Sequence, residues 1–397
     1  MKFQSISGRY RRTHYSILLL FLILGMNAAT WASRIPQLMD AMSINTAQMG
    51  MVLLACGIGA VVSFPLIAFS LNRWGSHIVC YFAVATLALL LSGLAFVNSF
   101  YVGIIWMFLE GVACAFLNAA MNSQGARLEE VTESKRMSIL HAAFSFGLLA
   151  SALFSSFVVY FFSDLLIHFS SVALLMIVLI FGVRGLLPQK PSSEQRVSPS
   201  EKSAFSAVLG LGAVMFFGTI VEGAMNDWSA LYLAREVEAS AFLMPFGIAI
   251  FSLSMVIGRL FSDRIRDRID DHTMISAGCF IAAIGLLVGV SLGTLYSALI
   301  AFALVGLGMA PVTPCVYAAA AKRSAFVLTT VASMGTAGFL AGPPVIGFIS
   351  GASSIKYGML CVALCAAMGC VSVLILRLSE SNSRGFWFVR EASDSTT

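Results

Sequence analysis

Two carboxylates lie inside an apolar stretch just past the midpoint of the chain. Glu222 and Asp227 belong to segment 219–228, whose other residues are mostly apolar and suit a membrane-spanning helix. An ionisable side chain in hydrocarbon is costly, so it usually faces a protein-lined cavity and marks a pathway for a substrate or an ion. Carboxylates in such a place can carry protons or pair with cations, and this segment is therefore the first candidate for function.

The two carboxylates are expected to act differently. Glu222 and Asn226 are four residues apart and share one helix face, whereas Asp227 is turned away from Glu222 by about 140°, at roughly 100° per residue. We predict that Glu222 loads and releases a proton; the alternative is a structural glutamate that stays protonated or hydrogen-bonded. Asp227 is predicted to be a gate residue or a salt-bridge partner, with Arg34 as its candidate partner. Beside it, Trp228 is expected at the membrane interface, where aromatic residues are enriched.

Two other titratable groups lie in apolar surroundings. Glu110 is a second candidate for carrying a proton, and a buried hydrogen bond to a neighbour suits it equally well. His141 can titrate near physiological pH. It begins an apolar stretch close to a charged loop, so we expect it to be a packing or gate hydrogen-bond partner more than a proton carrier.

The composition around these groups is that of a polytopic membrane protein. Of the 397 residues, 59% are hydrophobic and only 11% are charged, and the mean hydropathy is +0.90, far above that of a soluble globular protein. The net charge of +5 is spread over loops, so nucleic acid is not an expected partner. The eight cysteines lie in apolar runs without metal-site spacing, and no nucleotide-binding loop or nucleophile triad is present, so neither a metal nor a cofactor is expected.

Twelve apolar stretches are long enough to cross a bilayer, which needs about 20 residues each. They cover residues 15–37, 46–70, 77–97, 101–123, 138–161, 166–187, 204–233, 240–261, 272–291, 294–320, 325–350 and 354–378. If both termini lie inside, 21 Lys and Arg residues fall on the cytoplasmic side, against 3 on the other side: Arg34, Arg235 and Lys356. Since cytoplasmic loops keep the excess of positive charge, we predict this topology, in the inner membrane of the cell.

A polar connection at 188–203, rich in Pro, Ser and charge, divides the chain into six and six stretches. We therefore predict one bundle over 1–187, a cytoplasmic linker over 188–203, a second bundle over 204–379 and a tail over 380–397. Short echoes between the halves, such as Trp31 with Trp228 and Gly111 with Gly306, occur at offsets of 197 and 195 and suggest duplication.

Twelve stretches in two parallel halves resemble the major facilitator superfamily. Its loop signature, Asp-Arg/Lys-x-Gly-Arg-Arg/Lys, is partly kept at Arg73 and Gly75, and the equivalent loop of the second half contains Asp267 and Arg268. The chain is also similar throughout to a little-characterised branch of bacterial inner-membrane facilitators with sugar-porter-like relatives. That similarity rests on Trp31-Ala-Ser-Arg34-x-Pro36, His141-Ala-Ala-Phe-Ser145-x-Gly147, Glu222-Gly-Ala-Met-Asn226-Asp227-Trp228 and Gly342-Pro-Pro-Val-Ile-Gly347.

The resemblance implies an all-α membrane fold in which helices 1, 4, 7 and 10 line a central cavity. It places most of the unusual polar residues on those helices. The residues expected to contact the substrate are Asn27, Trp31, Asn118, Asn122 and Asn226, and the proton-coupling residues are Glu222 and Glu110. The residues expected to form gates are Arg34, Asp227, Trp228, His141, Arg73, Asp267 and Arg268.

The function expected from these features is secondary active transport by a monomer in the lipid bilayer. We expect proton-coupled uptake of a small polar organic solute, with sugar-like molecules as the leading class. The alternative within transport is proton-driven export of a drug, siderophore or metabolite. From other classes, a membrane sensor would normally carry a soluble domain, and a membrane enzyme would need a catalytic set, neither of which the sequence indicates.

Overall fold

The computed structural model describes residues 8–134, 136–162, 164–188, 202–266 and 268–394. Fourteen α-helices and no strand occur in these ranges. In the first half they are α1 (Gly8–Ala32), α2 (Ile35–Met42), α3 (Thr46–Val62), α4 (Phe64–Leu94), α5 (Phe100–Thr132), α6 (Met137–Phe161) and α7 (Leu165–Gly182). In the second half they are α8 (Lys202–Arg235), α9 (Phe246–Arg266), α10 (Asp271–Leu292), α11 (Leu295–Met309), α12 (Val312–Ala321), α13 (Ala325–Ala352) and α14 (Ile355–Asp394).

The apolar composition of the helices agrees with a membrane environment. Ten helical stretches, counting α11 with α12 as one, are long and apolar enough to cross a bilayer. The short α2 and α3 meet at 109° and would together add an eleventh. The apolar part of α9, Phe246–Ser262, is shorter because residues 240–245 form turns before it.

A single glycine divides α4 into two legs. Gly75 has φ 80° and ψ 152°, a backbone conformation that residues with a Cβ rarely adopt. Leu66 on one leg and Phe82 on the other line the same groove, of about 640 Å³. The break falls between the second and third predicted stretches, 46–70 and 77–97, which is why the sequence pattern separates them correctly.

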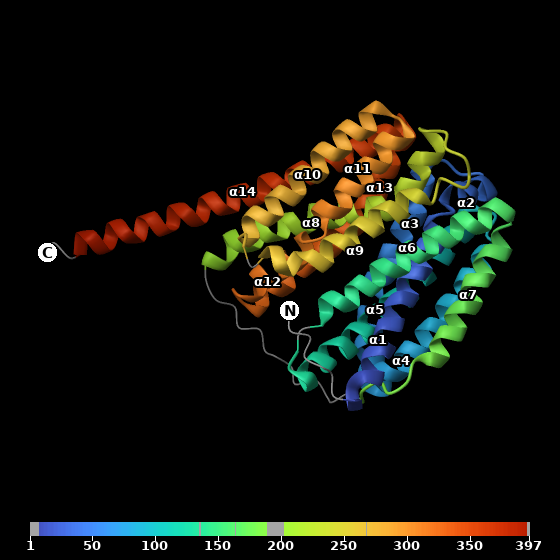
Figure 1. Cartoon of the computed structure of the whole chain (residues 1–397), viewed down its shortest axis with the longest axis horizontal. Helices are drawn as coiled ribbons and strands as arrows, with labels where there is room; N and C mark the ends of the chain where they lie inside the picture. The colour runs from blue at the N-terminus through green and yellow to red at the C-terminus, as the bar shows by residue number, and fades with distance from the viewer. Residues whose placement is uncertain (1–7, 135, 163, 189–201, 267, 395–397) are drawn as a thin grey trace.

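Two sets of helices are visible in Figure 1: a first helical set, α1–α7, in blue to green, and a second helical set, α8–α14, in yellow-green to red. The end of the molecule that carries α2 is called the α2 end below. The opposite end, where α1 and α8 begin, is called the linker end. Of the predicted linker, only Pro188, Lys202 and Ser203 lie within the described residues. The helix α14 continues as far as Asp394, through most of the predicted tail.

Small residues allow helices within each set to approach closely. A Cβ on Gly111 of α5 would lie 1.8 Å from the Cys56 carbonyl oxygen of α3, and one on Gly25 of α1 would lie 2.1 Å from the Phe144 carbonyl oxygen of α6. Such contacts are typical of membrane helices, which associate largely by close packing.

The two sets also meet backbone to backbone. A Cβ on Gly50 of α3 would lie 2.8 Å from the Pro343 carbonyl oxygen of α13, and one on Gly347 would lie 2.8 Å from the Gly50 Cα atom. Nearer the α2 end, Ala47 of α3 packs against Gly351 of α13 in the same way. This seam between α3 and α13 fixes how the sets face each other.

Candidate functional site

Glu222 lies at a polar junction between three helices of the second set. Its Oε1 atom accepts a hydrogen bond from the Thr313 hydroxyl of α12 at 3.2 Å. Its Oε2 atom lies 3.8 Å from Nη2 of Arg259 on α9, and only 24% of the Glu222 side chain and 14% of the Arg259 side chain are exposed. A carboxylate so placed has a cation and a hydroxyl as partners, which is the environment of a functional acid more than that of a lipid-facing residue.

Arg259 extends this junction to the first set. Its Nη1 atom donates a hydrogen bond to the Ser145 hydroxyl of α6 at 2.6 Å and lies 3.4 Å from the His141 carbonyl oxygen. Glu222, Arg259 and Ser145 therefore form a continuous polar chain from one set to the other, called the Arg259 link below. The sequence pattern missed Arg259 because it was counted as a loop charge, whereas it lies inside α9.

His141 contributes to this junction through its backbone. Its ring packs edge-on against Phe21 of α1, with 5.1 Å between the ring centroids. Its carbonyl oxygen is the atom that faces Arg259.

Glu110 occupies a separate site within the first set. It is buried on α5 and accepts a hydrogen bond from Nδ2 of Asn27 on α1 at 2.5 Å. The Cys114 thiol, one turn along α5, is 3.7 Å from the same oxygen. The amide oxygen of Asn27 is buried and has no hydrogen-bond partner among the described residues. The two predicted proton carriers, Glu110 and Glu222, thus lie in different sets with different partners.

Arg34 and Asp227 form no ion pair with each other within the described residues, so this expectation is wrong. Arg34 lies after the end of α1, as the N-cap of α2, and its Nη2 atom approaches the Asp164 carbonyl oxygen at 3.4 Å. Asp227 is buried on α8 and lies within electrostatic range of Cys56 on α3. The two side chains therefore point towards different helices.

The ion pair that joins the sets at the α2 end is formed by other residues. Nη2 of Arg235, at the end of α8, lies 2.6 Å from Oδ1 of Asp40 on α2. Gln37, one turn before Asp40, has its Nε2 atom 4.0 Å from the sulfur of Met244 in the second set. The sequence pattern used Arg235 only to orient the chain.

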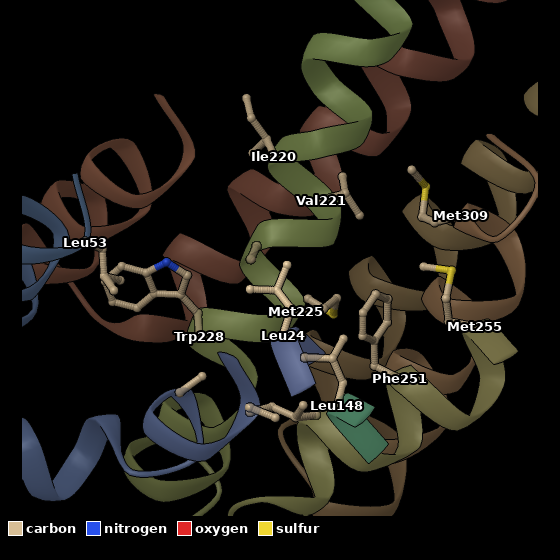
Figure 2. Packing of buried hydrophobic residues seen from close by; sticks show 14 of the residues in the cluster. Leu24, Leu53, Leu148, Ile220, Val221, Met225, Trp228, Phe251, Met255 and Met309 are labelled. Atoms are coloured by element: carbon tan, nitrogen blue, oxygen red, sulfur yellow. The ribbon is translucent and has the colours of Figure 1, made fainter. Parts of the chain in front are cut away.

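Apolar side chains from both sets pack together and are called the apolar seal below. They are Leu24, Leu53, Leu148, Met225, Trp228, Phe251 and Met255. Figure 2 shows Trp228 of α8 next to Leu53 of α3, and Met225 of α8 near Leu24 and Leu148, which belong to α1 and α6. The Trp228 side chain is fully buried among the helices, and its depth in the membrane stays a prediction.

Two indole groups at this level keep an unpaired donor. The N–H groups of Trp31 and Trp228 are both buried, and neither has a hydrogen-bond partner in the residues that the structure covers. Trp31 lies on α1 and Trp228 on α8, so each set contributes one such group.

The remaining predicted substrate residues lie on α5 and α8. Nδ2 of Asn122 donates to Oδ1 of Asn118, one turn earlier on α5, at 2.9 Å, and Asn118 is exposed. On α8, Nδ2 of Asn226 donates to the Glu222 carbonyl oxygen at 3.0 Å. The amide oxygen of Asn226 is buried without a partner in the described ranges.

Two of the predicted gate residues of the loops, Arg73 and Arg268, lie within the described residues. Arg73 is exposed, two residues before the break at Gly75. Asp267 lies outside the described residues, and the backbone N–H of Arg268 donates to the Ile265 carbonyl oxygen. Arg266 pairs with Asp271, with 2.9 Å between Nε and Oδ1, and Nζ of Lys322 lies 3.8 Å from Oδ2 of the same carboxylate. No group of three or more His, Cys, Asp or Glu side chains suited to a metal occurs within the described ranges.

Comparisons with known proteins give one consistent result. The Major Facilitator Superfamily model matches residues 17–325. An uncharacterised MFS-type transporter of Yersinia pestis is 31% identical over 368 residues, which cover 91% of this chain and 93% of the relative. Membrane protein MosC of Rhizobium meliloti is 29% identical over 371 residues, covering 90% and 88%.

Solved structures share the fold. A point mutant of the nucleoside transporter NupG superposes with a TM-score of 0.70 at 16% identity, covering 92% of this chain and 99% of NupG. A bacterial homologue of the human lysosomal transporter Spinster, in an inward-facing and occupied conformation, gives a TM-score of 0.70 at 13% identity, covering 94% and 98%.

Proposed function

Because this chain belongs to the major facilitator superfamily, we propose that it is a secondary active transporter of a small polar organic solute. It works in the inner membrane, with both termini in the cytoplasm, and takes up its solute together with protons. The observation that carries this proposal is the Arg259 link, in which a mostly buried carboxylate and a cation connect the two helical sets.

Alternating access requires that the two sets move as units. We assign residues 1–187 and 204–379 to these units, 188–203 to the connecting linker and 380–397 to the tail. The α2 end is closed by the apolar seal and by the Asp40–Arg235 pair, so uptake requires both to open. Asn118 is exposed on α5, as expected for a cavity open towards the linker end.

Proton coupling is assigned to Glu222. Its charge is compensated by Arg259, so adding or removing one proton changes the net charge of the junction between the sets. Glu110 is a second proton carrier in this proposal, but its partners Asn27 and Cys114 belong to the first set, and its protonation acts within that set.

The solute is proposed to be neutral and rich in hydroxyl groups. The unpaired groups near the seal comprise two acceptors, the amide oxygens of Asn27 and Asn226, and two donors, the indole N–H groups of Trp31 and Trp228. A hydroxyl both donates and accepts, so a sugar-like ring can satisfy both kinds of group when the sets separate. A nucleoside, the substrate class of the transporter NupG, also carries sugar hydroxyls and belongs in the test panel.

Export by proton antiport is the second candidate. The seal around Met225, Phe251 and Met255 is apolar, which would suit a drug, a siderophore or an apolar metabolite. The two proposals differ in the sign of the response to a pH gradient.

Flux in proteoliposomes tests the proposed function. Purified protein is first screened by thermal shift against sugars, cyclitols, nucleosides and lipophilic cations, and binders are then tested for transport with and without a pH gradient. Symport predicts accumulation on the alkaline side, abolished in Glu222→Gln but kept in Glu130→Gln, which removes an exposed carboxylate elsewhere. Accumulation on the acidic side would favour export, and full gradient-driven accumulation by Glu222→Gln would refute the assignment of Glu222.

A further inference from the structure

We infer that Arg259 is a positioning residue that transmits the charge state of Glu222 to the contact between α6 and α9. The inference rests on the proposed function, in which Glu222 gains and loses a proton. The sequence position of Arg259 suggests only a loop charge, whereas in the structure its side chain on α9 contacts Glu222 of α8 and Ser145 of α6.

The shape of the guanidinium group explains why it can join both partners. Arginine presents five N–H donors in a rigid plane, so orienting one nitrogen also orients the others. In Arg259 the Nη2 atom faces the carboxylate of Glu222 in its own set, while Nη1 faces the Ser145 hydroxyl of the opposite set. The attraction of Glu222 therefore aims the second nitrogen at α6.

Protonation of Glu222 would remove this orientation. A neutral carboxyl group no longer compensates the cation, and a mostly buried cation without a counter-ion is strongly unfavourable. The guanidinium group then needs more water than its 14% exposure supplies, and separation of α6 and α9 at this level would provide it. Ionised Glu222 thus favours the joined arrangement of the two helices, and protonated Glu222 favours their separation.

The other titratable groups around the junction come from two further helices. From α6, His141 lies within electrostatic range of Arg259. From α12, Tyr317 lies within range of Glu222 and Thr313 donates to it. His141 is the competing candidate for a pH-sensitive partner, so the experiment includes its substitution.

Hydrogen exchange of the full chain in lipid nanodiscs tests the inference. Amide exchange of α6 and α9 is measured at two pH values, after correction for the intrinsic pH dependence of exchange, in wild-type protein and in Glu222→Gln, Arg259→Gln, Ser145→Ala and His141→Gln. In Glu222→Gln, Arg259→Gln and Ser145→Ala, we expect the facing residues of both helices to exchange at least about ten times faster than in wild-type protein. This is the range for loss of a charge-assisted hydrogen bond. The double substitution Glu222→Gln with Ser145→Ala should add little to either single one, because all act on one chain of contacts.

A second ion pair of the same helix provides the control. Arg266 of α9 pairs with Asp271 of α10 inside the second set, at a shorter distance than Arg259 with Glu222. Asp271→Asn should leave exchange in α6 unchanged. Unchanged α6 exchange in both Glu222→Gln and Arg259→Gln would overturn the inference, as would a pH dependence that is lost in His141→Gln and kept in Glu222→Gln.

The outcomes separate this inference from the proposed function. Loss of proton-driven flux in Glu222→Gln with unchanged exchange in α6 would leave Glu222 as a proton carrier and remove Arg259 as its transmitter. Flux without any proton dependence, combined with faster exchange in α6, would instead leave the link as a structural contact and refute the coupling.

Discussion

Asp40 and Arg235 form an ion pair, with 2.6 Å between Oδ1 and Nη2, that connects the short helix α2 of the first helical set to the end of α8 in the second. Both side chains are largely exposed, at 69% and 50%. The pair therefore holds the α2 end closed by a contact that water and salt can reach.

Breaking this pair should open the α2 end slightly more often. Exposed ion pairs contribute about 0–1 kcal/mol, so Asp40→Asn should increase exchange of the α2 amides by no more than about fivefold. The exchanged pair Asp40→Arg with Arg235→Asp should restore protection, and high salt should reduce the difference between wild type and variant. An effect that the exchanged pair fails to reverse would show that the charges do not act through each other.

The unpaired indole N–H of Trp228 predicts that the Trp228→Phe variant is at least as stable as the wild-type protein. Trp228→Phe removes a buried N–H that has no partner among the described residues, and should raise stability or leave it unchanged, within about 1 kcal/mol. Trp228→Ala leaves a cavity between the sets and should cost about 3–5 kcal/mol. Thermal unfolding in detergent measures both. A loss of more than about 1 kcal/mol in Trp228→Phe would mean that the indole N–H is satisfied in the folded protein.

The contact of Gly111 with α3 predicts a large effect from one methyl group. Gly111→Ala places a Cβ 1.8 Å from the Cys56 carbonyl oxygen, so α3 and α5 must move apart, at a cost of about 1–3 kcal/mol. Gly223→Ala is the matched control, because its Cβ would lie 3.5 Å from the Phe339 ring, an ordinary contact. The yield of folded protein and its melting temperature should fall for the first variant only; a similar fall in both would contradict the packing argument.

The hydrogen bond from Asn27 to Glu110 predicts that the amide stabilises the buried carboxyl group. Asn27→Ala leaves the buried Glu110 oxygen with only the weak thiol donor of Cys114, and should cost about 1–3 kcal/mol. Asn27→Ala combined with Glu110→Leu removes both polar groups and should recover much of the loss. Denaturation of the purified variants measures this coupling, and strictly additive losses would show that the two side chains act independently.

Much of the fold could be predicted from the sequence, and the fold class is confirmed. The apolar stretches and the loops between them are set by composition, and the break at Gly75 falls where the polar loop residues Asn72 and Arg73 interrupt the apolar pattern. Breaks inside apolar stretches are harder to predict, because the apolar residues at the start of α2 continue the pattern of the helix that precedes it.

The polar contacts were harder to predict because they depend on rotation about each helix axis. Arg34 and Asp227 were matched by depth alone, and the end of α1 at Ala32 turns Arg34 towards Asp164. The contacts of Arg259 could not be predicted, because a positive-charge count assigns every arginine near a helix end to a loop. The roles of Glu222, Glu110 and the predicted gate residues stay predictions until flux is measured.

The seam between α3 and α13 has a consequence for the speed of switching. Gly50 and Gly347 touch through main-chain atoms, so this region has almost no side-chain rotamers to reorder when the sets tilt. A pivot of this kind lets the two bodies rock with little change in conformational entropy. The activation barrier then lies mainly in the contacts that must break, such as the Asp40–Arg235 pair and the Arg259 link. Single substitutions in those contacts should change the turnover rate more than substitutions along the pivot.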